Sequence, residues 1–268
     1  MRLLKPTTFV LLLFASAIAF TACEDDTDEP GPAEFGRIDI EFENVVGSNP
    51  LQLNSATPYT TPAGDQFTVT TFRYYISNIK LKKADGTEFI QPEAESYYLI
   101  DQARTESQKI SIPNVPDGDY NSLTFTIGVD SARNVDGVKP GALAPSDMFW
   151  NWNTGYIFMK LEGRSPQAPN STGAAAGGPL VYHIGGFRRG QNAVRTVTPG
   201  LNGRMLQVRE SRTPEVHIKA DVLKMFSGST TIRMAQLNTI HMPGPGAVTM
   251  SANYAAGMFT VDHVHGGN

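Results

Sequence analysis

The sequence has almost no cysteine: Cys23 is the only one in 268 residues. No disulfide can therefore form within one chain, although the compartment predicted below would permit one. The folded part must be stabilised by its hydrophobic core. The residues that follow Cys23 suffice for one large domain with a well-filled core or for two small ones.

Positive charge is also scarce. The chain has 22 lysines and arginines against 26 aspartates and glutamates, which gives a formal net charge of −4 at pH 7. Its only compact basic spot is the pair Arg188 and Arg189, which is typical of a solvated loop. A mildly acidic chain without a basic cluster argues against nucleic acid as a partner.

Catalytic motifs are absent as well. The sequence contains no Gly-x-Ser-x-Gly, no phosphate-binding loop and no His-Glu-x-x-His, which are local signatures of hydrolases, nucleotide-binding enzymes and metalloproteases. Lipidation of Cys23, predicted next, removes its thiol as a nucleophile. We therefore expect a protein that is not an enzyme.

Residues 1–22 have the pattern of a secretory signal peptide. Arg2 and Lys5 precede an apolar run that ends at Phe20, and small residues stand just before Cys23. The run is too short for a retained membrane span. The tetrapeptide FTAC resembles a bacterial lipobox, in which the cysteine is diacylated and becomes the new N-terminus. The alternative is an ordinary signal peptide followed by a chance cysteine.

Residues 23–35 are acidic, contain proline and are poor in apolar side chains, so we expect a flexible tether. Acidic residues directly after a lipidated cysteine resemble the surface-export tag of Bacteroidetes-type lipoproteins. The N-terminal region thus predicts a cell-envelope protein anchored in the outer membrane by its lipid, on either the surface or the periplasmic face. The folded domain is expected over residues 36–268.

From Gly36 onward the hydrophobic pattern has a period of two. Ile38, Ile40 and Phe42 alternate with acidic residues, which predicts a strand with one buried and one wet face. Further segments rich in β-branched and aromatic residues follow, separated by connectors that contain glycine and proline. This pattern predicts an all-β fold, an antiparallel β-sandwich with long loops and at most short helices.

Local signals add some detail. The dipeptide Asp85-Gly86 predicts a hairpin turn, because glycine accepts the positive φ that such turns require. A long, low-complexity loop is expected over Gly163–Gly178. Weak helical patterns cover only 221–226 and 253–258.

The C-terminal segment contains two of the five histidines, His263 and His265. On a regular strand they would share one face with Phe259 and Val261, and the intervening residues would face the other way. Their backbone positions would lie roughly 6.5–7 Å apart, a workable span for two ligands of one metal ion. Neutral imidazole suits copper or zinc. The alternative is a solvent-exposed polar strand end without a ligand.

The other three histidines have different surroundings. His183 lies in the apolar strand pattern LVYHIGG, on the face of Val181, where a core histidine and a metal ligand are both reasonable. His217 alternates with charged residues and is expected to face water. His241 precedes a Met-Pro-Gly turn, and His-Met is a pair that Cu(I) accepts.

Both tryptophans, Trp150 and Trp152, occur two residues apart. On a strand they would form an aromatic wall, either packed in the core or open as a platform for carbohydrate, because tryptophan contributes a large contact area in either place.

Several segments together resemble one protein family. They are IEFENVVGSNPLQL, FTVTTFRYYISNIKL, TIGVDSARNVDG, DMFWNWNTGYIFMKLEG, VYHIGG and FTVDHVH. They are similar to the MbnP-like family of copper-binding proteins, including its Bacteroidetes lipoprotein members, from about Gly36 to the C-terminus. The resemblance implies a β-rich secreted fold that binds copper through histidines. In some relatives it also implies a tryptophan that a di-haem peroxidase-like partner oxidises to kynurenine.

The resemblance points to His183 and to Trp150 or Trp152, and the final His263 and His265 match the ending of the lipoprotein branch. Two departures stand out. Relatives often carry a cysteine pair shortly after the YHIGG strand, which is missing here, and some have Trp-x-His where this chain has Trp-Asn-Trp. One expected copper ligand is therefore absent, which places the kynurenine chemistry in question.

These observations predict a lipid-anchored copper-binding protein for metal acquisition, storage or delivery. The expected ligands are His183, His263 and His265, with the tryptophan pair beside the site or modified, and zinc is the alternative ion. Because coordinating histidines must be neutral, metal affinity should fall as the pH drops through about 6.5. From a different class, the alternative is a surface glycan-binding or adhesion module that uses the tryptophan segment. A structural envelope protein without a ligand is the third interpretation.

Overall fold

The computed structural model describes residues 34–135, 137–151, 154–170, 172–173 and 177–266. All of them belong to the larger of two units of the chain, Ala33–Asn268. The predicted signal peptide, the lipidation site Cys23 and nearly all of the predicted tether lie outside the described residues, as does Trp152.

The smaller of two sheets has five strands. Its order is β16-β14-β1-β2, and β7 pairs with the same edge of β1 as β2, opposite β14. β1 and β14 run parallel, whereas the other pairs are antiparallel. The strands are β1 (Phe35–Val46), β2 (Asn49–Pro50), β7 (Lys109–Pro116), β14 (Glu215–Asp221) and β16 (Phe259–His265).

The larger sheet has eleven strands around the path β12-β8-β4-β10-β11-β15. Its pairs are antiparallel apart from β11 with β15. The strands are β3 (Tyr59–Thr60), β4 (Gln66–Lys83), β5 (Glu88–Ile90), β6 (Tyr97–Asp101), β8 (Gly118–Ile127), β9 (Phe149–Asn151), β10 (Gly155–Ser165), β11 (Gly178–Gly185), β12 (Arg195–Val197), β13 (Leu206–Val208) and β15 (Thr239–Ile240).

Helices are short in the described part of the chain. The α-helices are α1 (Leu223–Phe226) and α2 (Pro245–Ala255), and the 3-10 turns are η1 (Glu93–Glu95), η2 (Thr105–Gln108), η3 (Gly141–Leu143) and η4 (Ser146–Met148). α1 falls within the predicted 221–226. The prediction of 253–258 was wrong in its bounds, because α2 begins eight residues earlier, with proline at its first turn. Among the described residues no helix is long and apolar enough to span a membrane.

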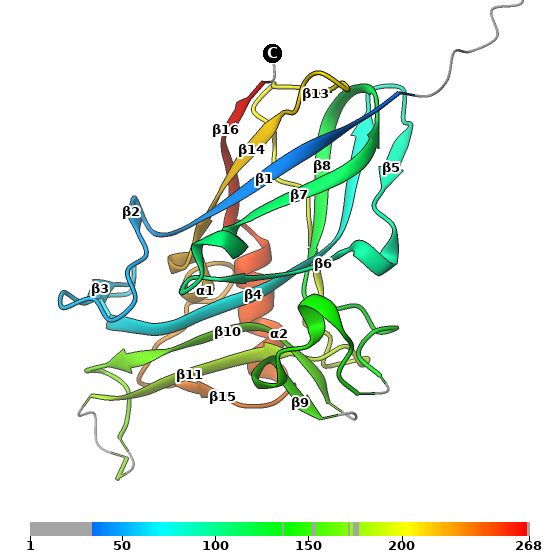
Figure 1. The fold of residues 1–268 in the computed structure, drawn as a ribbon. Helices are drawn as coiled ribbons and strands as arrows, with labels where there is room; N and C mark the ends of the chain where they lie inside the picture. Colours follow the sequence, from blue (N-terminus) through cyan, green and yellow to red (C-terminus); the bar gives the residue numbers. More distant parts are fainter. Residues whose placement is uncertain (1–33, 136, 152–153, 171, 174–176, 267–268) are drawn as a thin grey trace, which may run out of the picture. The chain divides into compact units, whose positions relative to one another are not determined.

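The core lies between the two sheets, and aromatic side chains fill its centre. Phe42 of β1 makes edge-to-face contacts with Tyr74 of β4, Phe125 of β8 and Phe259 of β16, with ring centroids 6.2, 5.8 and 6.4 Å apart. All four side chains are buried. The alternating pattern of β1 is confirmed, since Ile38, Ile40 and Phe42 are fully buried, and so is the β-rich sandwich with short helices (Figure 1).

The terminal strand departs from regular alternation. Where β16 pairs with β14, Asp262 is an extra residue between the paired positions of Val261 and His263. This β-bulge turns both Asp262 and His263 to the outer face, where 39% and 42% of their side chains are exposed. His263 and His265 do share a face, but the predicted sharing with Phe259 and Val261 was wrong, because those two residues point into the core.

Candidate metal centre

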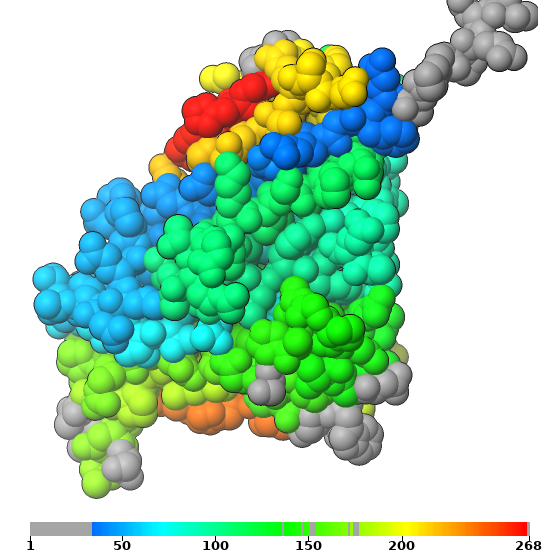
Figure 2. Space-filling view, in the orientation of Figure 1, coloured from blue at the N-terminus to red at the C-terminus, as the bar shows by residue number. Residues whose placement is uncertain are grey.

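The outer face of the five-stranded sheet aligns polar side chains in rows across its strands. One row runs from Lys109 of β7 through Glu41 of β1 and His217 of β14 to His263 of β16, because each residue is directly paired with the next. In the neighbouring row, His265 is paired with Glu215 in the same way. Figure 1 shows the four strands side by side, and Figure 2 shows β16, in red, at the surface.

Three imidazoles meet in these rows. Suitable nitrogen atoms of His217, His263 and His265 all lie within 4.8 Å of one another. The ring of His217 stacks on that of His263, with centroids 4.1 Å apart and planes inclined by 17°. The ring of His265 stands edge-on to both, with centroid distances of 5.0 and 4.6 Å. We call these three residues the histidine cluster.

The nitrogen atoms of the cluster are spaced for chelation. His263 Nε2 and His265 Nε2 are 3.1 Å apart. Two nitrogens bound to one ion at ~2.0–2.1 Å lie roughly 2.9–3.4 Å apart, depending on whether the angle at the ion is right or tetrahedral. His217 Nε2 is buried and has no hydrogen-bond partner among the described residues. A metal ion would give this nitrogen a partner, so the residues present fit an ion with imidazole ligands.

Two carboxylates adjoin the cluster, one from β1 and one from β14. Glu41 Oε2 lies 3.6 Å from His217 Nδ1, and Glu215 Oε1 lies 3.5 Å from His217 Nε2. Lys109 Nζ donates a hydrogen bond to Glu215 Oε1 at 2.7 Å, which lowers the pKa of Glu215. Glu215 is thereby ionised at neutral pH, and Lys109 supplies its counter-charge. The cluster itself remains the part of this face that is rich in nitrogen ligands.

The structure does not bring His183 to the histidine cluster. His183 lies on β11 of the larger sheet, where its Nε2 is 2.8 Å from Oε1 of Glu162 on β10. Its ring also meets that of His241 edge-on, with centroids 6.0 Å apart. Burial lowers the pKa of His183 in spite of the opposing effect of Glu162. As predicted, His183 shares its half-buried face with Val181.

Trp150 packs against β11, the strand that carries His183. It belongs to β9 and is half-buried against the core. Its ring lies directly over Gly185, two residues after His183, since a Cβ atom at Gly185 would come within 2.7 Å of Trp150 Cζ3. The predicted set of ligands and neighbours is therefore divided between the two sheets, and Trp152 lies outside the described residues.

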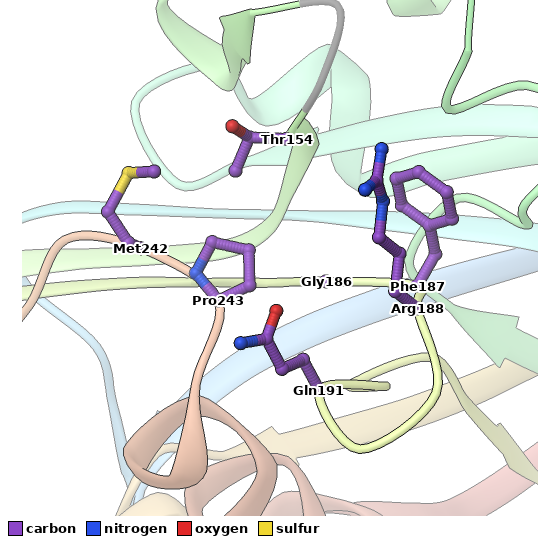
Figure 3. Close-up of a pocket in the computed structure, with 7 residues that line it drawn as sticks. All are labelled: Thr154, Gly186, Phe187, Arg188, Gln191, Met242 and Pro243. Atoms are coloured by element: carbon purple, nitrogen blue, oxygen red, sulfur yellow. The ribbon is translucent and has the colours of Figure 1, made fainter.

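A cavity of about 250 Å³ opens near the end of β11. Gly186, Phe187 and Arg188 line one part of it, and Met242 and Pro243 line another (Figure 3). Its described lining contains no histidine and no carboxylate, so its ligand chemistry differs from that of the histidine cluster.

His217 is the member of the cluster that sequence reasoning missed. Its alternation with charged residues predicted that it faces water; it does lie on the polar face of β14, but only 23% of its side chain is exposed and its Nε2 is buried. Its partnership with His263 depends on the register between β14 and β16, which are separated by nearly forty residues of chain. No local pattern carries that information.

Comparison with known proteins identifies the fold. The model of the MbnP family matches residues 35–243, a span that includes His217 and ends before β16. The solved structure of MbnP from Methylosinus trichosporium matches with a TM-score of 0.55 at 16% identity, over 85% of this chain and 98% of that one. No curated protein matches the chain. Since the family model covers well over half of the sequence, the chain belongs to the MbnP family.

Proposed function

We propose that the protein is a lipid-anchored copper-binding protein that acquires, stores or delivers the metal and does not catalyse a reaction. The observation that carries this proposal is the histidine cluster, in which three imidazoles from two neighbouring strands converge on one surface. The copper chemistry implied by the MbnP-like resemblance agrees with this ligand set. Copper is the cargo of the protein in this account.

The ligand chemistry favours copper over hard cations. Calcium and magnesium prefer shells of oxygen ligands, whereas imidazole nitrogen suits copper and zinc. Zinc is the alternative ion, because it also accepts three imidazoles and leaves a fourth position open. The surface position of the cluster, with His265 exposed and His263 partly exposed, suits a site that exchanges its metal with another protein.

The experiment is a competition titration with copper and with zinc on the soluble protein that starts after Cys23. The double variant His263→Ala/His265→Ala should lose the tightly bound equivalent that the histidine cluster holds. Glu88→Gln is the control, because it removes an exposed polar side chain of the larger sheet that lies on a strand without histidines. If the double variant binds copper as tightly as the unaltered protein, the cluster is not the site. If no form binds metal, the copper function is contradicted and glycan binding by the tryptophan segment becomes the function to test.

We further propose His183 as a ligand at a second, separate position, on the strength of the family resemblance. Its present partner is the carboxylate of Glu162. Copper stoichiometry separates the two positions: His183→Ala should remove one bound equivalent and leave the equivalent held by the cluster. An unchanged stoichiometry would show that His183 is only a hydrogen-bonding residue.

Trp150 and Trp152 are proposed as residues beside that second position, and oxidation of one of them by a di-haem peroxidase-like partner is the corresponding modification. Trp150 lies over Gly185, close to His183 in sequence. Mass spectrometry of tryptic peptides from the native host should then find kynurenine at one of these tryptophans. Unmodified tryptophan in protein purified with its copper would contradict the modification.

Lipidation of Cys23 is proposed from the signal peptide and the FTAC sequence. In the native host, labelled palmitate should be incorporated into the protein and not into Cys23→Ala. The lipidated form should sediment with the outer membrane, and protease treatment of intact cells tells the surface face from the periplasmic face. Recovery of the unaltered protein without lipid would contradict the anchor.

A further inference from the structure

We propose that Asp262 is the positioning residue of the metal site: it fixes the tautomer and the ring orientation of His263, so that His263 presents the lone pair of Nε2 to an ion shared with His265. The inference deepens the proposed function and rests on it. Lys219 holds Asp262 in place.

A chain of short hydrogen bonds leads from Lys219 to the metal-binding nitrogens. Lys219 Nζ donates to Asp262 Oδ1 at 2.7 Å, and Asp262 Oδ2 lies 2.8 Å from His263 Nδ1. An ionised carboxylate can only accept hydrogen bonds. The proton of the neutral imidazole must therefore reside on Nδ1 of His263, and its lone pair must reside on Nε2.

The second contact of the ring follows from this assignment. His263 Nε2 lies 3.1 Å from His265 Nε2. If His263 Nε2 carries a lone pair, His265 must donate an N–H to it in the metal-free protein. A metal ion bound to both nitrogens would take the place of this proton. The proton would leave Nε2 of His265 for solvent, and Nδ1 of His265 would take one up, so that the imidazole stays neutral. In metal sites generally, a carboxylate on the far nitrogen orients the ring and raises its basicity.

The bulge in β16 makes this arrangement available. In a regular strand, neighbouring residues point to opposite faces, and Asp262 would point into the core when His263 points outward. Because Asp262 is the extra residue, both side chains lie on the outer face. Such bulges commonly re-aim a side chain beside a functional site. The same strand thus supplies the ligand and the residue that orients it.

The test begins with the tautomers in the metal-free protein, read by long-range ¹H–¹⁵N NMR of the histidine rings. The unaltered protein should show His263 with its proton on Nδ1 and His265 with its proton on Nε2. In Asp262→Ala, His263 should change to a mixture of tautomers. An unaltered His263 with its proton on Nε2 would overturn the proposal, whether or not the protein binds copper.

The second readout is copper affinity. Asp262→Ala should weaken binding by about 10–100-fold, the usual effect of removing the residue that orients a ligand, and Lys219→Met should weaken it less. Glu88→Gln is the matched control, since it removes an exposed carboxylate paired with a lysine, Lys80, at 3.3 Å on the other sheet. Equal affinity in Asp262→Ala and Glu88→Gln would overturn the positioning role. The expected tautomers without any copper binding would support the orientation of His263 and refute the proposed function.

Discussion

His217 lies within the polar row of the five-stranded sheet, between Glu41 and His263. It stacks on His263 on one side and lies beside Glu41 on the other. Because its Nε2 is buried without a hydrogen-bond partner in the described part of the chain, the side chain contributes little to the metal-free fold. Its position is explained better by a role as a metal ligand than by a contribution to the stability of the fold.

Replacing His217 should therefore affect metal binding far more than folding. We expect His217→Ala to lower copper affinity by at least ~10–100-fold. That is the usual effect of removing a residue that only orients a metal ligand, and removal of a ligand itself should cost no less. The midpoint of urea unfolding of the metal-free protein should hardly change. Competition titration and urea unfolding of the same preparation measure the two effects. A large loss of stability with unchanged affinity would assign His217 to the fold.

Asp65 differs from His217, because its charged side chain stabilises the folded state. Its carboxylate is almost fully buried, accepts a hydrogen bond from Arg233 Nη2 at 2.9 Å and another from the Met234 amide at 2.9 Å. The hydrogen bond from Arg233 is the largest of the causes that lower the pKa of Asp65. A carboxylate whose pKa is lower in the folded than in the unfolded state stabilises the fold above the unfolded pKa, about 3.9.

Asp65→Asn should accordingly reduce the free energy of unfolding by about 1–3 kcal/mol at neutral pH. The difference in unfolding free energy from the unaltered protein should shrink as the pH falls below about 4. In that range the Asp65 carboxylate takes up a proton in the unfolded state, and at still lower pH it does so in the folded state too, so the stabilisation by the charged form is lost. Urea unfolding at pH 7 and pH 3 measures this. The control is Asp119→Asn, whose pair with Arg209 is well exposed, and which should cost about 0–1 kcal/mol. Equal costs for both variants would contradict the account.

At the scale of elements, the sequence predicted those features that are determined by residues close together in the chain. The alternation in β1 and the turn at Asp85-Gly86 were confirmed, since β4 and β5 form the expected hairpin. The start of α2 was misplaced because a Gly-Pro-Gly sequence is typical of turns, whereas Pro245 here occupies the first turn of the helix. The bulge at Asp262 has no signature of its own.

One glycine illustrates how closely two strands approach. Gly163 lies where the register between β10 and β4 shifts, and a Cβ atom there would lie 1.9 Å from the carbonyl oxygen of Thr68. Gly163→Ala should therefore displace backbone and cost about 1–3 kcal/mol of unfolding free energy. Gly200→Ala, with no heavy atom within 4 Å of the added carbon, is the control and should be near neutral. Similar unfolding midpoints for the two variants would contradict the tight approach.

At the scale of the whole molecule, the all-β sandwich and the family resemblance were confirmed, but the composition of the site was not predictable. The sequence shows two histidines at the end of the chain. Only the fold shows that β14 and β16 are neighbours and that His183 belongs to the other sheet. Sheet topology joins segments that are distant in sequence, so the periodicity of each segment leaves their pairing open.

Copper should stabilise the entire fold, because the ligands that we propose lie on the edge strand β16 and on β14 beside it. An ion that binds only the folded state raises the unfolding free energy by about 2.7 kcal/mol at a free concentration one hundred times the Kd. Thermal unfolding with and without copper should show a higher Tm that a chelator reverses. His263→Ala/His265→Ala should show a smaller shift, because it loses the ion held by the histidine cluster, and an equal shift in that variant would place the stabilising ion elsewhere.

The central claim is that His217, His263 and His265 bind one ion together. Pulsed EPR of the Cu(II)-loaded protein tests it most directly, because imidazole ligands give characteristic nitrogen couplings that can be counted. The account predicts that the unaltered protein and Glu88→Gln share one spectrum, and that His217→Ala loses one coupled imidazole from the bound ion. Identical nitrogen couplings in His217→Ala and the unaltered protein would contradict the claim.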